Sequence, residues 1–222
     1  RRRCLCAGMA PELISALQAE HLVALANLPA DPDFCPAPLK TLILIGPEGG
    51  LNWWQTVTRS PEWSDGQPDP IDRWSKRILG GLAARFDGLA LFPSDGPPYP
   101  PFFRWAQDSG ALWQSPVGML VHAEAGLWVS FRGALAVPFD VDLPTPANPC
   151  LTCAAQPCRT ACPVNALSLD GYDVAACHGY LDTDPGNLCL SEGCRARAAC
   201  PASQRHARLA EQSAYHMSRF HK

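Results

Sequence analysis

Cysteine is the residue type with the clearest chemistry in this chain. Eight of the eleven cysteines lie between Pro149 and Pro201, about a quarter of the 222 residues. They are Cys150, Cys153, Cys158, Cys162, Cys177, Cys189, Cys194 and Cys200. Too few hydrophobic residues surround them for an independent core, so the region needs a covalent or metal staple. Disulfides, structural zinc and iron–sulfur clusters are the three staples that compete.

The spacing of the cysteines separates these alternatives. Disulfides are typical of small secreted domains, whereas this region follows a larger domain and we find no export signal. Structural zinc prefers two closely spaced pairs of ligands, and only Cys150 and Cys153 form a C-x2-C pair here. Both alternatives stay open, but the spacing favours iron–sulfur ligation.

The run from Cys150 to Pro163 resembles a ferredoxin motif. Bacterial ferredoxins contain C-x2-C-x2-C-x3-C-P, whose fourth cysteine ligates the other of two clusters. This chain has C-x2-C-x4-C-x3-C-P, and Cys200-Pro201 repeats the prolyl ending. Crossing of the two prolyl cysteines predicts two sets of [4Fe-4S] ligands. The first set is Cys150, Cys153, Cys158 and Cys200, and the second is Cys162, Cys177, Cys189 and Cys194. The looser spacing after Cys177 leaves a single-cluster variant open.

Several short segments of the second half carry a further pattern. They are Gly110–His122, Gly126–Trp128, Ala161–Leu167, Tyr172–Leu181, Gly193-Cys194 and Cys200-Pro201. The last four resemble the ferredoxin-like domain of epoxyqueuosine reductase and related cobalamin-dependent proteins. The first two are similar to the segment of that family just upstream of its clusters. The resemblance covers about the last half of the chain and implies a cobalamin-type α/β domain coupled to two [4Fe-4S] clusters.

This resemblance implies roles for two residues. The last cluster motif of the family has the form Gly-Cys-x2-Cys-x3-Cys-Pro, and Arg197 stands here in place of the middle cysteine. We expect Cys189 to supply the missing thiolate. The acidic proton donor of the family has Asp95 as its nearest match, in a loop rich in glycine and proline that also holds Tyr99. Asp95 is therefore the candidate catalytic residue.

The residues before the cysteine region indicate a mixed α/β domain. Thr41–Ile45 is a continuous apolar run that stops at Gly46, as in a strand buried on both faces. We expect helices at 11–26, 72–86 and 102–109, a strand at 88–92, and a hairpin with strands at 117–121 and 127–131. The expected fold class is α+β. A mixed α/β domain over residues 9–143 precedes a bacterial-ferredoxin-like two-cluster module over 144–222, which closes with a C-terminal helix.

Other conspicuous residues of the first domain favour structural roles. The seven tryptophans could line a flat cofactor cavity, but core packing is the favoured interpretation. His122 ends an apolar strand and is expected to be a hydrogen-bonded structural histidine. The turn Gly46–Gly50 lacks the lysine and hydroxyl of a phosphate-binding loop.

Composition bears on the partners of the chain. The net charge of −3, with 18% charged residues, argues against nucleic acid as a partner. No apolar run approaches the roughly 18 residues that span a bilayer, so we expect a soluble, cytoplasmic chain. Residues 1–8, which include Cys4 and Cys6 and precede Met9, receive no structural weight.

Charged residues near the C-terminus allow two interpretations. Arg195, Arg197, Arg205 and Arg208 flank the last cysteines, either as a solvated rim or as a docking patch for an acidic redox partner. The spacing of His206, His216 and His221 gives no closed metal set, and we expect them at the surface.

These patterns favour an iron–sulfur electron-transfer protein with two [4Fe-4S] clusters that serves a redox partner protein or a small-molecule acceptor. A competing hypothesis is a reductase whose first domain binds cobalamin or flavin and is fed by the clusters. A third is a zinc-stapled interaction module without a redox role.

Overall fold

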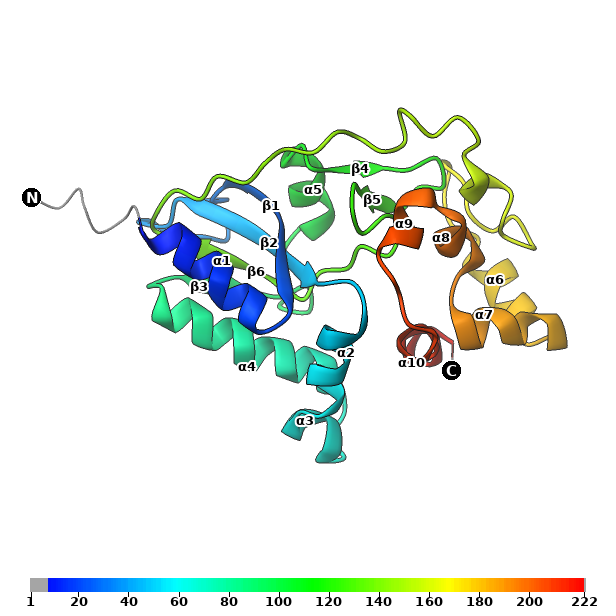
Figure 1. Cartoon of the computed structure of the whole chain (residues 1–222), viewed down its shortest axis with the longest axis horizontal. Coiled ribbons are helices and arrows are strands. Elements are labelled where there is room, and N and C mark those ends of the chain that lie inside the picture. The colour runs from blue at the N-terminus through cyan, green and yellow to red at the C-terminus, as the bar shows by residue number, and fades with distance from the viewer. Residues whose placement is uncertain (1–7, 222) are drawn as a thin grey trace, which may run out of the picture. The chain divides into compact units, whose positions relative to one another are not determined.

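The computed structural model describes residues 8–221, so Cys4 and Cys6 lie outside the described residues (Figure 1). The chain forms two compact units. The first unit holds residues up to 48, 52–111 and 130–145, and the second holds 49–51, 112–129 and 146 onward. Their helices and antiparallel strands confirm the α+β class. The division into domains at 143 and 144 stays a prediction, and Leu112–Val129 lies with the second unit.

A four-stranded antiparallel sheet is the centre of the first unit. Its strand order is β1-β2-β6-β3, with β1 at Leu22–Pro29, β2 at Thr41–Pro47, β6 at Gly133–Val137 and β3 at Leu89–Leu91. Strand β2 pairs with β1 on one edge and with β6 on the other. Every residue of β2 is buried, which confirms the expected strand with two covered faces.

Helices pack against this sheet (Figure 1). Helix α1 (Met9–Ala19) and helix α5 (Phe102–Asp108) contact β1, and helix α4 (Pro70–Arg85) contacts β3 and β6. Two shorter helices, α2 (Leu51–Thr58) and α3 (Pro61–Ser64), lie between β2 and α4 in the chain. The helices expected at 72–86 and 102–109 and the strand expected at 88–92 are therefore confirmed to within two residues.

The helix predicted over residues 11–26 is wrong in its second half. Helix α1 ends at Ala19, His21 turns the chain with a φ of 55°, and β1 begins at Leu22. Leu22 and Leu25 are compatible with helical spacing, but both are buried in a strand that pairs with β2. Pairing with a strand distant in the sequence has therefore overridden the local pattern.

The predicted hairpin of 117–121 with 127–131 is also wrong. Strand β5 (Leu120–His122) pairs with the earlier strand β4 (Leu112–Gln114), and 127–131 contains no strand. Gly118 makes the difference, because its φ of 77° allows the tight turn in which its N–H donates to the Ser115 carbonyl at 3.0 Å. A turn therefore begins before the segment that the sequence pattern assigned to the first strand.

Aromatic side chains fill much of the core of the first unit. Trp53, Trp74 and Trp105 are each only 1% exposed. The rings of Trp53 and Trp74 meet edge to face with centroids 6.2 Å apart, an arrangement that the ring quadrupoles favour. For these three residues the interpretation as core tryptophans is confirmed.

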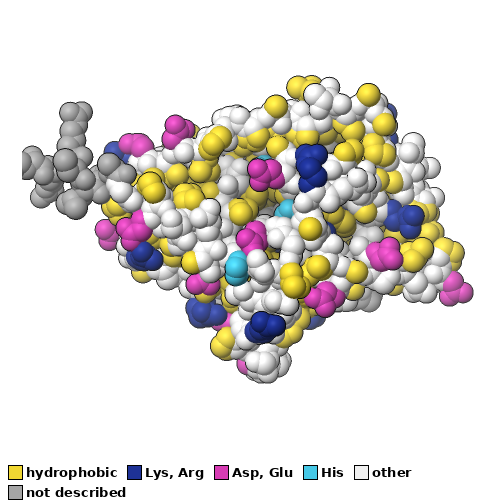
Figure 2. All heavy atoms as spheres, viewed as in Figure 1, with side chains coloured by type: hydrophobic (Ala, Val, Ile, Leu, Met, Phe, Trp, Pro, Cys, Tyr) yellow, Lys and Arg dark blue, Asp and Glu magenta, His cyan; other side chains and the backbone are white. Residues whose placement is uncertain are grey.

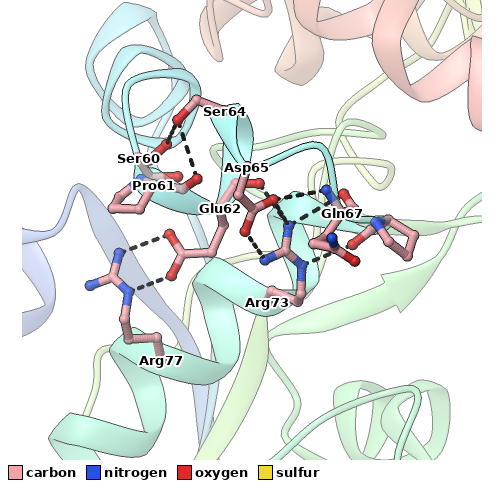
Figure 3. Close-up of polar contacts among 9 residues, drawn as sticks. Ser60, Pro61, Glu62, Ser64, Asp65, Gln67, Arg73 and Arg77 are labelled. Atoms are coloured by element: carbon pink, nitrogen blue, oxygen red, sulfur yellow. Dashed lines mark hydrogen bonds and ion pairs between the residues drawn. The ribbon is translucent and has the colours of Figure 1, made fainter.

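Two arginines of α4 fasten α3 to it (Figure 3). Arg77 makes two hydrogen bonds to the carboxylate of Glu62, and Arg73 donates to both oxygens of Asp65 at 2.6 and 2.8 Å. The Glu62 side chain is only 11% exposed. The hydrogen bonds from Arg77 lower the pKa of Glu62 to about 2, although partial burial opposes them.

This ion pair makes stability depend on pH. A carboxyl whose pKa is depressed on folding stabilises the protein above its unfolded pKa of about 4.3 and loses that contribution as the pH falls toward 2. We expect Glu62→Gln to lower the free energy of unfolding by about 1 kcal/mol at pH 7, because Arg77 is half exposed and screened. Urea unfolding from pH 7 to pH 3 should show this difference shrinking. A difference that stays constant over that range would contradict the assignment.

The second unit consists of the hairpin β4–β5 and a series of short helices. The helices are η2 (Pro157–Arg159), α6 (Val174–Leu181), η3 (Asp184–Gly186), α7 (Asn187–Glu192), α8 (Arg195–Ala199), α9 (Pro201–Arg205) and α10 (Ala210–Phe220). Helix α10 packs on α7, which confirms the predicted C-terminal helix.

Gly126 allows the hairpin to approach α9. A Cβ at Gly126 would lie 2.1 Å from the Ser203 nitrogen, and the φ of Gly126 is 57°. The Leu127 N–H donates to the Ser203 hydroxyl at 2.8 Å. Only glycine fits this contact without displacing backbone.

Charges of both signs are scattered over the face drawn in Figure 2, among hydrophobic side chains. Within residues 8–221, no helix is both long and apolar enough to cross a membrane.

Candidate metal centres

Four of the predicted ligands line one cavity of the second unit. Cys150, Cys153, Cys158 and Cys200, the first cysteine group, all border this space of about 200 Å³. Val121 and Leu127 form part of its wall, and Cys158 and Cys200 belong to the same buried apolar cluster. The cavity therefore places four cysteines beside apolar side chains.

Cys200 reaches this cavity from the far end of the cysteine region. It stands between α8 and α9 in an extended conformation, and Pro201 begins α9. Proline has no N–H and its ring clashes with the preceding turn of a helix, so α8 must end there. Helix α8 packs on η2, which contains Cys158. This packing brings together cysteines that are far apart in the sequence.

The first group also interacts electrostatically. Burial raises the pKa of Cys150 to about 11, and the neighbouring charges of Cys200, Cys158 and Cys153 raise it further. Burial likewise raises the pKa of Cys158, with Cys200 and Cys153 contributing. A metal that binds here must therefore displace the thiol protons.

The other four predicted ligands form a second cysteine group, composed of Cys162, Cys177, Cys189 and Cys194. Burial raises the pKa of Cys177, and Cys194 and Cys162 act on it as neighbouring charges. Burial raises the pKa of Cys189 as well, with Cys194 and Cys177 among its neighbours. The Cys162 sulfur accepts the Ala166 N–H at 3.4 Å. The two groups contain the same cysteines as the two predicted ligand sets. Metal binding itself stays a prediction.

Tyr172 and Arg197 lie beside the second group. The Tyr172 hydroxyl hydrogen-bonds Cys177, and burial together with this bond raises the pKa of Tyr172. Arg197 lies near Cys194 and Tyr172, and burial lowers the pKa of its guanidinium. Tyr172 could not be recognised from the sequence, because an aromatic residue before a helix carries no ligand signature.

Asp173 caps the helix that carries Cys177. Its carboxylate accepts the Ala176 N–H at 2.8 Å, at the start of α6. We expect Asp173→Ala to lower the free energy of unfolding by about 1 kcal/mol, whereas Asp173→Ser should retain most of the cap. Urea unfolding followed by circular dichroism measures both changes. Equal midpoints for the alanine and serine variants would argue against this capping role.

Asp95, the candidate catalytic residue, lies in the loop after β3 in the first unit. One of its oxygens accepts from Lys76 at 3.1 Å, and the other accepts the Phe92 N–H at 3.1 Å. These contacts hold the loop in shape. Tyr99 on the same loop is 62% exposed. A catalytic role for Asp95 stays a prediction.

The histidines differ partly from expectation. His122 is a hydrogen-bonded structural residue as predicted, since its Nδ1 accepts the N–H groups of Glu124 and Ala125 at 3.3 Å. The expectation that His221 is an ordinary surface residue is wrong. Its side chain is 16% exposed, and its ring nitrogens lie 2.7 Å from His178 Nδ1 and 2.9 Å from Asp182 Oδ1.

His206 is half-buried and also departs from the surface expectation. Burial lowers its pKa to about 4, and the positive charges of Arg208 and His122 act in the same direction. Two of the flanking arginines make contacts inside the unit. Arg205 donates to the Ala123 carbonyl at 3.1 Å, and Arg208 donates to the Ser213 hydroxyl at 3.3 Å.

No group of three or more His, Cys, Asp or Glu side chains within 8–221 is arranged to hold one metal ion. The cysteines of the first group instead surround the cavity described above.

Sequence comparison and structure comparison give different results for this chain. No family model matches the chain, and no curated protein matches it. Among solved structures, a crystal structure of epoxyqueuosine reductase with a tRNA-Tyr epoxyqueuosine-modified tRNA stem loop is similar, with a TM-score of 0.58 and 13% sequence identity. The match covers 94% of this chain and 69% of that chain. At this identity the likeness is one of fold.

Proposed function

We propose that the second unit binds two [4Fe-4S] clusters and that the chain transfers electrons one at a time. The observation that carries this proposal is that Cys150, Cys153, Cys158 and Cys200 line one cavity. Of the other four, Cys177 has Cys162 and Cys194 as neighbours, and Cys189 has Cys194 and Cys177. Four thiolates are the ligand number of a [4Fe-4S] cluster. The first cysteine group would hold one cluster and the second cysteine group the other.

The size and lining of the first cavity fit a polyatomic group. A water molecule occupies about 30 Å³ of the liquid, so a space of about 200 Å³ has room for several atoms. Its wall combines four cysteines with apolar side chains and with polar residues such as Gln156 and Arg205. The polarity around a cluster is one influence on its reduction potential. When bound, each cluster would supply a one-electron couple. The chain itself would position the thiolates and exclude solvent.

Residues beside the second group would act on its cluster without ligating it. The hydroxyl of Tyr172 is a hydrogen-bond donor to sulfur, and Arg197 is a positive charge close to Cys194. Hydrogen bonds and local charge are the means by which proteins tune such sites.

A reductase is the second candidate, and the fold likeness favours it. The similar solved protein is itself a reductase and was crystallised with a tRNA stem loop. By that analogy this chain would use its clusters to reduce a substrate of its own, and an RNA stem loop becomes a candidate ligand. The low net charge of the sequence argues against an RNA ligand, and a shared fold does not by itself imply a shared function.

The competing reductase hypothesis places cobalamin or flavin in the first domain. The first unit has a cavity of about 220 Å³ between α4, the loop after β3 and Phe131. Pockets for drug-sized ligands run from about 300 to 1,000 Å³. That cavity by itself does not fit a corrin ring or a flavin, and we assign no step to either group.

Iron and sulfide analysis of anaerobically purified protein tests the main proposal. We expect about eight iron and eight acid-labile sulfide per chain, with low-temperature electron paramagnetic resonance signals after reduction. About four of each would support the single-cluster variant. Near-stoichiometric zinc without sulfide would establish the zinc-stapled module instead.

RNA binding tests the second candidate. Fluorescence anisotropy with a tRNA-Tyr stem loop, and with an unrelated stem loop of equal length as control, measures preference at two salt concentrations. Tighter binding of the tRNA-Tyr stem loop at both would support the RNA-directed reductase, because charge contacts alone weaken with salt and do not discriminate sequence. Equal binding of the two would argue against it.

A further inference from the structure

A second cavity lies wholly within the first unit, apart from the cysteine groups in the sequence. Its volume is about 220 Å³, and it is bounded by α4, the loop after β3 and the segment leading into β6. The lining residues are Asp72, Lys76, Phe92–Ser94, Phe131 and Arg132. Aromatic and basic side chains therefore share one small space.

Arg132 is the most enclosed charge of this cavity. Its side chain is 12% exposed, its backbone N–H donates to the Ile45 carbonyl of β2 at 2.8 Å, and its guanidinium lies over the Trp53 ring at 5.9 Å. An Asp72 carboxylate oxygen lies 3.8 Å from the Arg132 guanidinium. At this distance the two side chains form an ion pair but no hydrogen bond with each other. The Asp72 side chain is 61% exposed, so water screens this ion pair.

Another part of the wall is formed by the loop after β3. The Asp95 N–H donates to the Phe92 carbonyl at 3.0 Å, and the Phe92 N–H donates back to the Asp95 carboxylate at 3.1 Å. Asp95 also holds Lys76 at 3.1 Å, and the Lys76 nitrogen lies 5.5 Å from the Phe92 ring. The second cation and the aromatic wall are thus positioned before any ligand arrives.

We propose that this cavity binds a small organic carboxylate with a flat apolar body. The carboxylate would take hydrogen bonds from the guanidinium of Arg132, whose planar fork matches two oxygen atoms, with Lys76 as a second positive charge. The body of the ligand would lie against Phe92 and Phe131. The cavity is smaller than drug-sized pockets, which limits the ligand to about one ring.

Benzoate is a suitable probe, and benzamide has nearly the same shape without the charge. Isothermal titration calorimetry on the full chain should detect benzoate binding, with benzamide at least tenfold weaker. Arg132→Gln should weaken benzoate at least tenfold. Lys76→Met, a change at a half-exposed side chain that should leave the fold intact, should weaken it at least threefold. The matched control is Arg85→Gln, because Arg85 lies on the same helix and pairs with Glu12 outside the cavity.

Three results would overturn the site. They are equal binding of benzamide and benzoate, an equal loss in the Arg85→Gln control, and no detectable benzoate binding at millimolar concentration. Iron content, measured on every sample, separates this inference from the proposed function. If the Arg132→Gln variant loses benzoate binding but keeps its iron, the substitution has affected the first unit and has left the metal content of the second unit unchanged.

Discussion

Replacing Cys189 by alanine is expected to remove about half of the bound iron and sulfide. Cys189 is 7% exposed and interacts with Cys194 and Cys177, so the second cysteine group would keep only three thiolates. Iron–sulfur clusters are usually held by four, and the first cysteine group does not include Cys189. Iron and sulfide analysis after anaerobic reconstitution, together with paramagnetic resonance of the remaining cluster, measures the effect.

Cys35→Ala is the matched control for this substitution. Cys35 is also buried, at 3% exposure, but it lies in the first unit and belongs to neither cysteine group. We expect this variant to keep all of its iron. Full iron retention by Cys189→Ala would exclude Cys189 as a ligand, and equal loss in both variants would point to general destabilisation.

Replacing Trp74 by alanine is expected to lower the free energy of unfolding by about 3 to 5 kcal/mol, which is the usual cost of a large aromatic deleted from a core. Trp74 is 1% exposed, lies on α4, and packs edge to face on Trp53. Its removal leaves a cavity beneath the helix that covers β3 and β6. Urea unfolding monitored by circular dichroism gives the change.

Phe103→Ala serves as the control for the tryptophan variant. Phe103 is 47% exposed on α5, so its loss should change stability by less than about 1 kcal/mol. A Trp74→Ala variant as stable as Phe103→Ala would show that Trp74 does not carry the core of the first unit.

Several features of the fold could be predicted because their causes are local. The run Thr41–Ile45 is β-branched or apolar at every position, which favours a strand with both faces covered, and β2 is buried throughout. The helix at α4 has an apolar face, and Pro70 suits its first turn. The strand conformation of Leu22–Pro29 was not predictable in this way, because its leucines fit a helix equally well. Only pairing with β2 selects the strand.

For the candidate metal centres too, some features could be predicted from the sequence and others could not. Residue types and spacing alone predicted a staple for the eight thiols, which stays a prediction, and showed that proline after Cys162 and Cys200 interrupts any helix there. Tertiary structure decided which thiols are neighbours, since the packing of α8 on η2 brings Cys200 to Cys158, and it placed Tyr172 beside Cys177.

Tertiary structure also decided the cavity around Arg132. Its lining comes from three separate segments that carry no shared motif, so no local pattern could reveal it. The spacing of residues along a chain indicates the chemistry of a site when the residues that form the site are near one another in sequence. Contacts between distant segments depend instead on the packing of the whole unit, which only the folded structure determines.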